Sequence, residues 1–277
     1  MELTSHDVVG CIRRLSHTRR VGHAGTLDPL ATGVLLLGIG RATRLLEYLA
    51  GLPKTYETTL RLGQETNTYD AEGEIMAERP FAHLSLTDFQ TVLAQFRGPI
   101  QQKPPIYSAI KKDGRPLYKL ARQGQDIDVP AREVVIHELT VLAWQPPDVT
   151  LRVTCSSGTY VRSLGHDIGQ VLGCGAYLTA LRRTAVGDFT LAQTVPLADL
   201  TSANLAGYVL PPETAVAQLP RLDLPAPEQE RLLLGQRLAR ETDHPLHSLV
   251  RVMAADGRLL GILRAEDDYW QPHKMFP

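Results

Sequence analysis

A glycine-rich stretch, residues 21–40, restricts the possible fold more than any other, because one carboxylate stands in it among uncharged side chains. That carboxylate is Asp28, and the following Pro29 favours an extended rather than a helical backbone at Asp28. The glycines permit tight turns, and the apolar run of residues 34–39 has the length of a buried strand. We therefore predict a loop, anchored on a buried strand, that presents Asp28. The alternative at this point is an aspartate that only caps a turn, as Asp before Pro commonly does.

The length and composition are typical of a soluble globular protein. The chain has 277 residues, enough for one large domain and a small one, with 43% hydrophobic and 21% charged residues. No apolar run approaches the ~18 residues that span a membrane, and residues 1–5 have neither the basic segment nor the apolar core of a secretion signal. We therefore expect a cytoplasmic protein without a membrane segment.

The potential metal ligands are scattered along the chain. Cys11, Cys155 and Cys174 form no CxxC pair, so we expect small core residues rather than a disulfide framework or a zinc site. The histidines form no HExxH pattern, and no segment matches the phosphate loop GxxxxGK[ST]. We therefore expect neither a metal nor a nucleotide cofactor.

The net charge of −1 does not favour a polyanionic partner, but the charges are unevenly distributed. Residues 11–61 contain eight basic and three acidic side chains, and residues 97–122 contain seven and one. Between them, residues 62–96 contain one basic and six acidic side chains. Two basic segments separated by an acidic one suit a protein with one positive face for nucleic acid. The alternative is that these charges lie on ordinary solvated helix faces.

Hydrophobic periodicity predicts helices and strands in the first third of the chain. Apolar residues at helical spacing predict helices over residues 5–17, 41–49 and 86–96. Alternation over residues 56–62 predicts a half-buried strand with Tyr56 at its first position. These residues alone favour interpreting Tyr56 as a strand-end aromatic with its hydroxyl in solvent.

Residues 97–124 differ from their surroundings. They combine three prolines before Ser108 with a DG turn, two tyrosines and clustered Lys and Arg. We expect this segment to be poorly suited to a core and well suited to RNA, where cations meet phosphates and aromatics can stack. We also expect it to be mobile without a ligand.

The middle of the chain predicts a strand pair followed by a helix. Residues 134–144 and 149–155 have the pattern of antiparallel strands, and Thr159 is expected to cap the helix that follows. Arg162 falls in its first turn, where the helix dipole disfavours a cation. We therefore expect an anionic partner for Arg162, a carboxylate or a phosphate. Residues 177–184 predict a further strand.

Five prolines between residues 210 and 227 predict a domain boundary. The remaining residues predict a short helix over residues 229–235 and strands over residues 249–254 and 259–264, joined through a DG turn. A module of about 60 residues is near the lower limit for independent stability, so we expect it to pack on the main domain.

Four motifs in this order and spacing resemble the TruB family of tRNA pseudouridine synthases. They are GHAGTLDPLATGVLLLGIGRATR, KTYETTLRLGQETNTYDAEGE, CSSGTYVRSLGHDIG and LRRTAVGDF, and the match covers residues 3–188. The tail resembles the PUA-type RNA-binding module of that family. The resemblance implies an α+β fold: a mixed, largely antiparallel sheet flanked by helices, the pseudouridine synthase fold, with a small C-terminal β-rich module. We place the catalytic domain at residues 1–212, with residues 102–124 as a thumb over RNA, and the PUA-like domain at residues 213–277.

The resemblance also implies a reaction and a catalytic residue. The family isomerises a specific uridine in the T loop of tRNA, at position 55, to pseudouridine without a cofactor. Asp28 would be the catalytic aspartate, which attacks the ribose or the base or removes a sugar proton. Tyr160 and Arg162 would lie at the floor of the cleft, with Arg162 salt-bridged to Asp28 so that the carboxylate stays ionised. A carboxylate suits the chemistry, because the glycosidic bond must break and re-form without a redox or metal step.

Three further positions resemble residues of the family that contact the flipped base or replace it. The target base lies inside a folded loop, so it must leave the stack, and the pocket must replace its lost stacking. Tyr56 resembles the tyrosine that stacks on the uracil and receives or relays the C5 proton. Leu181 resembles the apolar residue that packs on the base. His23 resembles the residue that enters the RNA loop in place of the flipped nucleotide.

The chain departs from the family pattern at its start and leaves two alternative functions open. The family has a Lys-Pro-x-Gly stretch before Thr4, whereas this chain begins MELTS; a late start-site assignment or a true absence would account for this. The runner-up function is a tRNA-folding chaperone that uses the same cleft, with chemistry secondary. The second alternative, a glycoside hydrolase, would require a second carboxylate as general acid, and Asp167 is the candidate in these motifs. For the enzyme we expect a monomer whose partner is the T stem-loop of tRNA.

Overall fold

The computed structural model describes residues 3–108, 111–112, 115–116, 129–240 and 243–276. Its contacts divide the chain into two compact units, each built from separate segments. The first unit consists of Met1–Ser5, Thr26–Leu35 and Gly51–Thr194, and the second of His6–Gly25, Leu36–Ala50 and Val195–Pro277. The expected domain boundary after residue 212 falls inside the second unit and stays a prediction.

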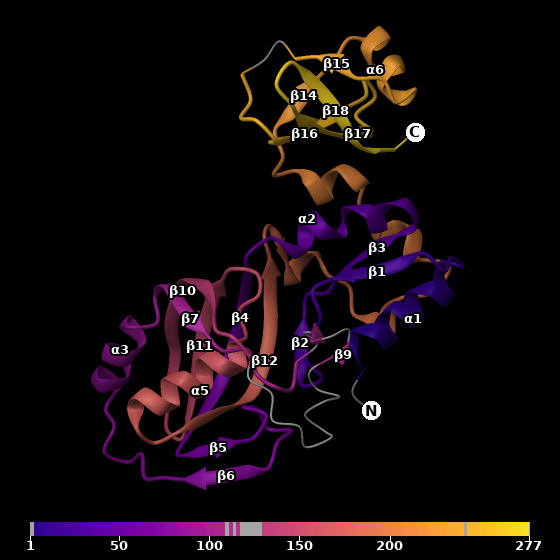
Figure 1. Ribbon diagram of the computed structural model, residues 1–277. Coiled ribbons are helices and arrows are strands. Elements are labelled where there is room, and N and C mark those ends of the chain that lie inside the picture. Colours follow the sequence, from indigo (N-terminus) through magenta and orange to yellow (C-terminus); the bar gives the residue numbers. More distant parts are fainter. Residues whose placement is uncertain (1–2, 109–110, 113–114, 117–128, 241–242, 277) are drawn as a thin grey trace. The chain divides into compact units, whose positions relative to one another are not determined.

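The first unit is built on a seven-stranded sheet (Figure 1). Its strand order is β13-β12-β4-β11-β10-β7, with β2 pairing in parallel to β12 and every other pair antiparallel. The strands are β2 (Ala31–Gly33), β4 (Lys54–Leu62), β7 (Gly98–Gln102), β10 (Arg132–Gln145), β11 (Asp148–Cys155), β12 (Ala176–Val186) and β13 (Phe189–Thr190). The predicted mixed, largely antiparallel sheet is therefore confirmed, as are the strands expected from residues 56–62, 134–144, 149–155 and 177–184.

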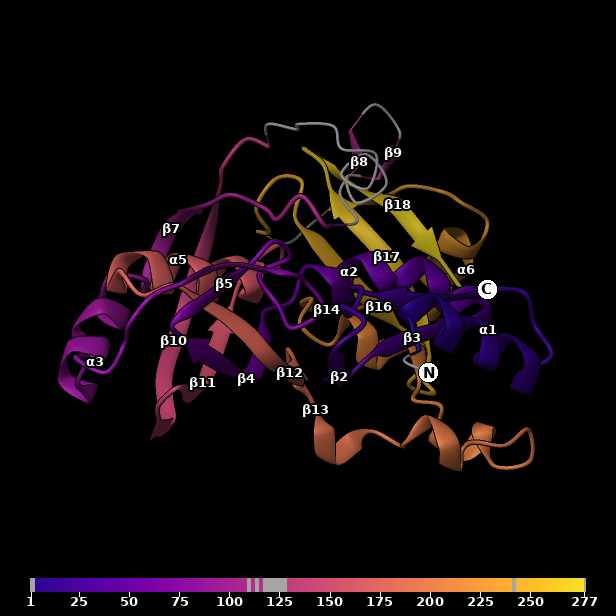
Figure 2. The same ribbon diagram turned by 90° about the horizontal axis from the view of Figure 1, so that it is seen from below.

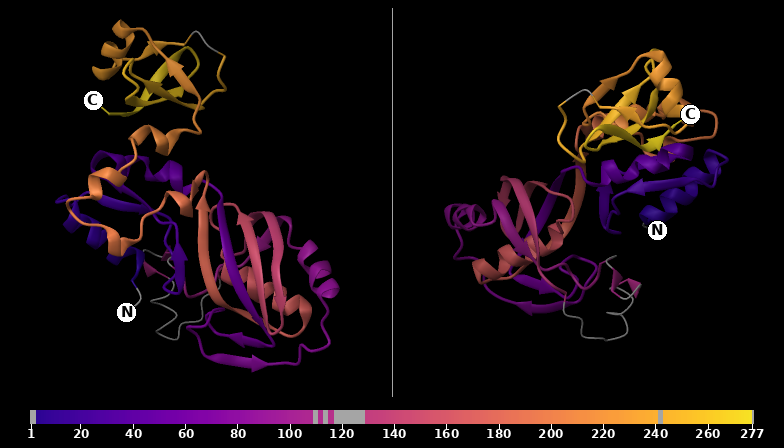
Figure 3. Two further views of the ribbon diagram at one scale, coloured as in Figure 1. Left: turned by 180° about the vertical axis from the view of Figure 1, so that it is seen from behind. Right: turned by 45° about the horizontal axis from the view of Figure 1, so that its top comes forward.

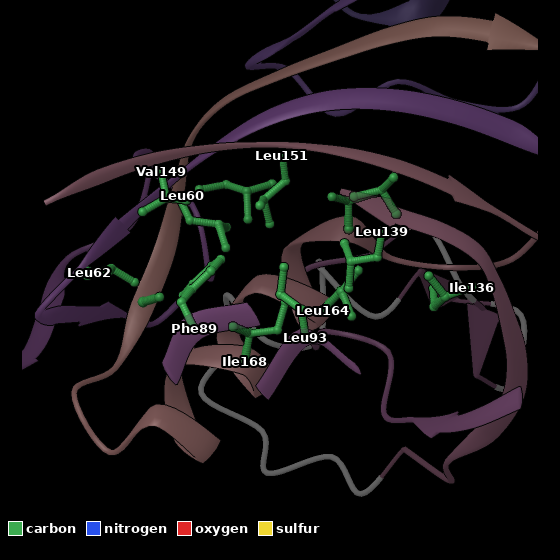
Figure 4. Close-up of a cluster of buried hydrophobic side chains, with 14 of the residues drawn as sticks. Leu60, Leu62, Phe89, Leu93, Ile136, Leu139, Val149, Leu151, Leu164 and Ile168 are labelled. Carbon is green, nitrogen blue, oxygen red and sulfur yellow. The ribbon is translucent and has the colours of Figure 1, made fainter. Parts of the chain in front are cut away.

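Two helices, α3 (Leu86–Ala94) and α5 (Val161–Leu172), pack on one side of this sheet (Figure 4). Phe89 of α3 and Ile168 of α5 belong to the same fully buried cluster as Leu60 and Leu151 of the sheet. Helix α3 begins with a capping box at Ser85, and α5 ends, as its sequence predicts, at a glycine in the left-handed conformation. Figure 3 (left) shows the sheet from the side opposite α5. This unit also contains a hairpin of β5 (Gln64–Thr66) and β6 (Ile75–Glu78) and a short helix, η2 (Leu191–Gln193).

The second unit contains a five-stranded sheet (Figure 2). In order these are β14 (Arg221–Asp223), β16 (Leu249–Met253), β17 (Leu259–Ala265), β18 (Tyr269–Met275) and β15 (Leu238–Ala239), with helix α6 (Ala226–Leu233). The rest of the unit comprises α1 (Ser5–Leu15), the pair β1 (Val21–Ala24) and β3 (Leu36–Ile39), η1 (Gly40–Leu45), α2 (Leu46–Ala50), η3 (Leu197–Asp199), η4 (Leu205–Tyr208) and η5 (Pro212–Val216). The predicted C-terminal strand pair is confirmed, and the predicted helix lies three residues earlier than expected.

One expectation about residues 97–124 is wrong. Their first part is not an excursion from the core, because β7 is the edge strand of the main sheet and both Gln102 and Ser108 are buried. Pro99 is compatible with this position because an edge strand tolerates a missing N–H donor. Farther along, β8 (Lys111–Lys112) and β9 (Arg115–Pro116) form a two-residue ladder. Residues 109–110, 113–114 and 117–128 lie outside the described residues, so their mobility stays a prediction.

Candidate active site

The Asp28 loop is held on the main sheet by β2. The Ala31 N–H donates to the Asp28 carbonyl at 2.9 Å, and the Val34 N–H donates to the Arg183 carbonyl at 2.8 Å. Gly33 makes this close approach possible, since its φ is +102° and a Cβ there would lie 2.1 Å from the Arg183 oxygen. The loop is therefore anchored on a strand, but the predicted anchor is wrong: the anchor is the partly exposed β2 on β12, whereas the strand within residues 34–39, β3, pairs with β1 in the other unit.

Asp28 forms a two-point ion pair with Arg162. The Arg162 Nε donates to Asp28 Oδ2 and its Nη2 donates to Asp28 Oδ1, both at 2.9 Å. The arginine side chain is 5% exposed, whereas that of Asp28 is 29% exposed. Paired parallel N–H···O bonds of this kind fix the orientation of a carboxylate as well as holding it. The anionic partner expected for Arg162 is therefore Asp28, and the carboxylate remains accessible from outside.

A second carboxylate, Asp70, shares the same guanidinium. Its Oδ2 lies 3.2 Å from Arg162 Nη1, and its side chain is 2% exposed. Asp70 Oδ1 accepts hydrogen bonds from the Thr68 hydroxyl at 2.6 Å and from the Glu72 N–H at 3.1 Å. The sequence offers no signal for this role, because an aspartate in an acidic turn is also typical of a solvated loop.

Two main-chain carbonyls complete the surroundings of Arg162. Thr68 O accepts from Nη1 and Tyr107 O accepts from Nη2, each at 3.1 Å. The guanidinium therefore donates four hydrogen bonds, two to Asp28 and two to carbonyls, and its Nη1 also lies within ion-pair distance of Asp70. A buried arginine satisfied in this way has one orientation, and it imposes that orientation on Asp28.

Tyr56 lies on β4, directly across from Arg183 of β12. Arg183 is buried, donates from Nε to the Val34 carbonyl at 2.7 Å and hydrogen-bonds the Tyr56 side chain. Burial raises the pKa of Tyr56, the Arg183 charge opposes this, and the Asp28 charge adds a smaller increase. The phenol is therefore neutral at pH 7 and lies within electrostatic reach of Asp28, rather than being a solvent-exposed strand-end group.

Leu181 lies in the same part of the first unit. It pairs with Ala31 of β2 and Thr58 of β4, and it belongs to the buried cluster against which Tyr56 packs. The structure thus brings Asp28, Tyr56, Arg162 and Leu181 together. His23 lies on β1 in the second unit, so its place relative to Asp28 stays a prediction.

Tyr160 differs from the expectation for the start of α5. The N-cap residue is Tyr160 rather than Thr159, and the Thr159 hydroxyl instead donates back to the Ser156 carbonyl at 3.0 Å within the preceding turn. The ring of Tyr160 is covered by the Arg132 guanidinium, whose carbon lies 5.0 Å from the ring centroid. Tyr160 therefore stands just before the helix, two residues from Arg162.

The second unit has a basic hollow of about 510 Å³, lined by Arg20, Arg41, Arg44 and His273 together with Pro272 and Met275. Among the described residues that line it, none carries a carboxylate. Three of its cations come from the first basic segment of the sequence. A concave cluster of arginines attracts phosphates, so this surface fits the predicted positive face.

The described chain shows neither a metal cluster nor a disulfide. Within the ranges given above, no three or more His, Cys, Asp or Glu side chains gather so as to hold a metal ion. Cys155 and Cys174 are buried, as expected of core residues, whereas Cys11 is partly exposed, and all three are free thiols. No helix in the described ranges is both long and apolar enough to cross a membrane.

The fold agrees with the pseudouridine synthase class that the four sequence motifs resemble, and the comparisons with known proteins show this class. The chain belongs to the TruB family. Residues 13–161 match the family model "TruB family pseudouridylate synthase (N terminal domain)", residues 162–217 "tRNA pseudouridylate synthase B C-terminal domain", and residues 220–274 "Pseudouridine synthase II TruB, C-terminal".

Named relatives and a solved structure agree with this membership. The chain is 45% identical to tRNA pseudouridine synthase B of Ralstonia pickettii, over 98% of this chain and 90% of the relative. It is also 45% identical to the protein of the same name from Thermobifida fusca, over 99% and 94%. A solved structure described as a Cbf5-Nop10-Gar1 complex is similar at a TM-score of 0.77 and 26% identity, covering 99% of this chain and 82% of that one.

Proposed function

We propose that this protein converts a specific uridine in the T loop of tRNA, position 55, to pseudouridine, with Asp28 as the catalytic residue acting on a flipped-out base. The observation that carries the proposal is the contrast in burial within one ion pair. Arg162 is buried and held by Asp28 and by two main-chain carbonyls, while Asp28 keeps 29% of its side chain accessible. A substrate can therefore reach the carboxylate, whose orientation is already set.

The chemistry fits the residues that surround Asp28. The bond from N1 to C1′ must break, the uracil must rotate while trapped, and C5 must bond to C1′ and lose its proton. Asp28 starts the reaction by attacking the ribose or the base or by removing a sugar proton. Tyr56, a neutral phenol, stacks on the base and receives or relays the C5 proton, and Leu181 packs on the base.

The RNA is held through charge and through the residues that flank the loop. The basic hollow of Arg20, Arg41, Arg44 and His273 binds phosphates, and His23 enters the T loop in place of the flipped nucleotide. Residues 102–124 act as a thumb on the RNA, and residues 213–277 act as a PUA-like RNA-binding domain. The protein acts as a cytoplasmic monomer.

Asp28→Asn tests this proposal. Tritium release from tRNA labelled at C5 of uridine should fall by about 10³-fold or more, because the group that touches the reacting atoms is lost, while tRNA binding on a filter stays within about twofold. Asp148→Asn is the matched control, since it changes an exposed carboxylate that is also paired with an arginine, and it should release tritium at the wild-type rate. If Asp28→Asn releases tritium at the wild-type rate, the assignment is refuted. If the wild-type protein and Asp28→Asn both refold tRNA and neither releases tritium, the chaperone function is favoured instead.

A further inference from the structure

Gln102, the last residue of β7, is a fully buried polar side chain that the reaction described above does not use. Its Nε2 donates to the Tyr160 carbonyl at 3.0 Å, and its Oε1 accepts from the Tyr160 N–H at 2.8 Å. Tyr160 is the N-cap of α5, and in the described chain its own side chain makes no capping hydrogen bond. The Gln102 amide therefore fixes, from a neighbouring strand, the residue at which this helix begins.

Arg132 holds the same tyrosine from another direction. It lies directly across from Gln102 in the β7–β10 ladder, so these two residues stand where the chain leaves the main sheet and where it returns. Its guanidinium covers the Tyr160 ring and donates to the Gly158 carbonyl in the turn before α5. Both ends of the segment 102–132 thus converge on Tyr160.

The contacts continue from Gln102 to the carboxylate. The Ser163 hydroxyl donates to the Lys103 carbonyl at 2.9 Å, and Arg162 Nη2 donates to the Tyr107 carbonyl at 3.1 Å. That same Nη2 donates to Asp28 Oδ1 at 2.9 Å. The start of α5 is therefore connected on one side to the residues that follow β7 and on the other side to Asp28.

We propose that Gln102 is a positioning residue for the isomerisation: by clamping the main chain of Tyr160 it sets the start of α5 and so aims Arg162 at Asp28. This inference rests on the proposed role of Asp28. Two parallel hydrogen bonds at 2.9 Å tolerate only a few tenths of an ångström of displacement, and Arg162 follows the clamped residue by two positions. Releasing the clamp shifts the guanidinium, and the carboxylate loses its orientation. Gln102 is the first residue of the proposed thumb, but its side chain is buried, so its replacement removes no contact with RNA.

The test separates chemistry from binding with Gln102→Met and Gln102→Glu. Methionine has a similar length and makes neither hydrogen bond, so the single-turnover rate at saturating enzyme should fall about 10- to 100-fold, with the dissociation constant for tRNA within about twofold. Glutamate has the same shape, but its ionised form accepts and does not donate. The protonated form can do both, and burial raises the pKa of a carboxyl group. The rate of Gln102→Glu relative to wild type should therefore recover as pH falls from 8.5 to 6.

Gln101→Glu is the control, because it places the same charge one residue earlier, on an exposed position of the same strand. Its rate should match wild type at every pH, and all proteins are assayed at a temperature where circular dichroism shows them folded. Wild-type rates in Gln102→Met, or equal losses of rate and of tRNA affinity, would overturn the positioning role. A relative rate of Gln102→Glu that does not change with pH would overturn it as well. Failure of the wild-type protein to form pseudouridine, or full activity of Asp28→Asn, would overturn the proposed function instead.

Discussion

Replacing Asp70 by asparagine removes a negative charge from the buried side of the Arg162 guanidinium with almost no change in shape. The carboxylate uses its two oxygens differently, with Oδ1 facing two donors, the Thr68 hydroxyl and the Glu72 N–H, and Oδ2 facing Arg162 Nη1. An amide has one oxygen and one NH₂ group. Either orientation of asparagine therefore points the NH₂ group at a donor, and the lost contact cannot be regained by a flip.

The loss of stability in Asp70→Asn depends on the contacts that Arg162 keeps. Removing one partner of a buried ion pair costs about 3–5 kcal/mol when the other charge is left alone. Here Arg162 keeps both bonds to Asp28, so we expect the free energy of unfolding to fall by about 2–3 kcal/mol, close to one charged hydrogen bond. Without its inner anchor the guanidinium reorients and Asp28 moves with it. A loss of about 1.4–2.8 kcal/mol of transition-state stabilisation corresponds to a rate about 10- to 100-fold lower.

Single-turnover tritium release and thermal unfolding measure the two quantities on the same preparations. The matched control is Asp148→Asn, which breaks the pair with Arg61, where the side chains are 41% and 39% exposed. An exposed pair is worth about 1 kcal/mol or less, and this one lies away from the proposed reacting groups, so the rate should not change. If Asp70→Asn releases tritium at the wild-type rate, the idea that Arg162 needs two carboxylates to orient Asp28 is wrong.

Three further predictions use other parts of the chain. Gly33→Ala should cost more than about 3 kcal/mol in urea unfolding, because its Cβ would lie 2.1 Å from the Arg183 oxygen, while Gly40→Ala, with open space at its Cβ, should cost only about 1–2 kcal/mol. Burial raises the pKa of Asp167 from 3.8 to about 6, so the folded state binds its proton more tightly and stability falls as pH rises through that range. Asp167→Asn should therefore raise the unfolding free energy by about 1–2 kcal/mol at pH 7.5, allowing for partial exposure, and by nothing near pH 3. Arg20→Gln should weaken tRNA binding and reduce the salt slope by about 1 without changing the saturated single-turnover rate.

The sequence predicts those elements best whose pattern has one physical explanation. Strand β4 alternates because one of its faces is buried, and α5 carries Leu164 and Ile168 on a single apolar side. Strand β7 was missed because prolines and cations resemble a loop, and an edge strand tolerates both. The cap of α5 was misplaced by one residue, because the main chain of its N-cap, Tyr160, is held by Gln102, which is far away in the sequence.

The site shows a similar limit. The position of Arg162 in a first helical turn indicated an anionic partner but left open whether this was a carboxylate or a phosphate. The pairing with Asp28 spans 134 residues of sequence, and it was expected only through the family resemblance. Asp70 escaped notice, and Asp167 was taken as the nearest second carboxylate, because local sequence does not show which carboxylates a fold brings to the same guanidinium.

The exposure of the three charged groups favours Asp28 over Asp70 as the carboxylate that meets the substrate in the proposed reaction. Exposure rises from 2% at Asp70 through 5% at Arg162 to 29% at Asp28, so the charges are ordered from the interior to the surface. Both oxygens of the inner carboxylate, Asp70, already contact groups of the protein: Thr68, Glu72 and Arg162. The cluster has two carboxylates for one guanidinium, and only the outer carboxylate, Asp28, is accessible. If the reaction uses one oriented carboxylate at a flipped base, as we propose, accessibility assigns that role to Asp28, and Asp70 affects the reaction only by fixing the arginine between them.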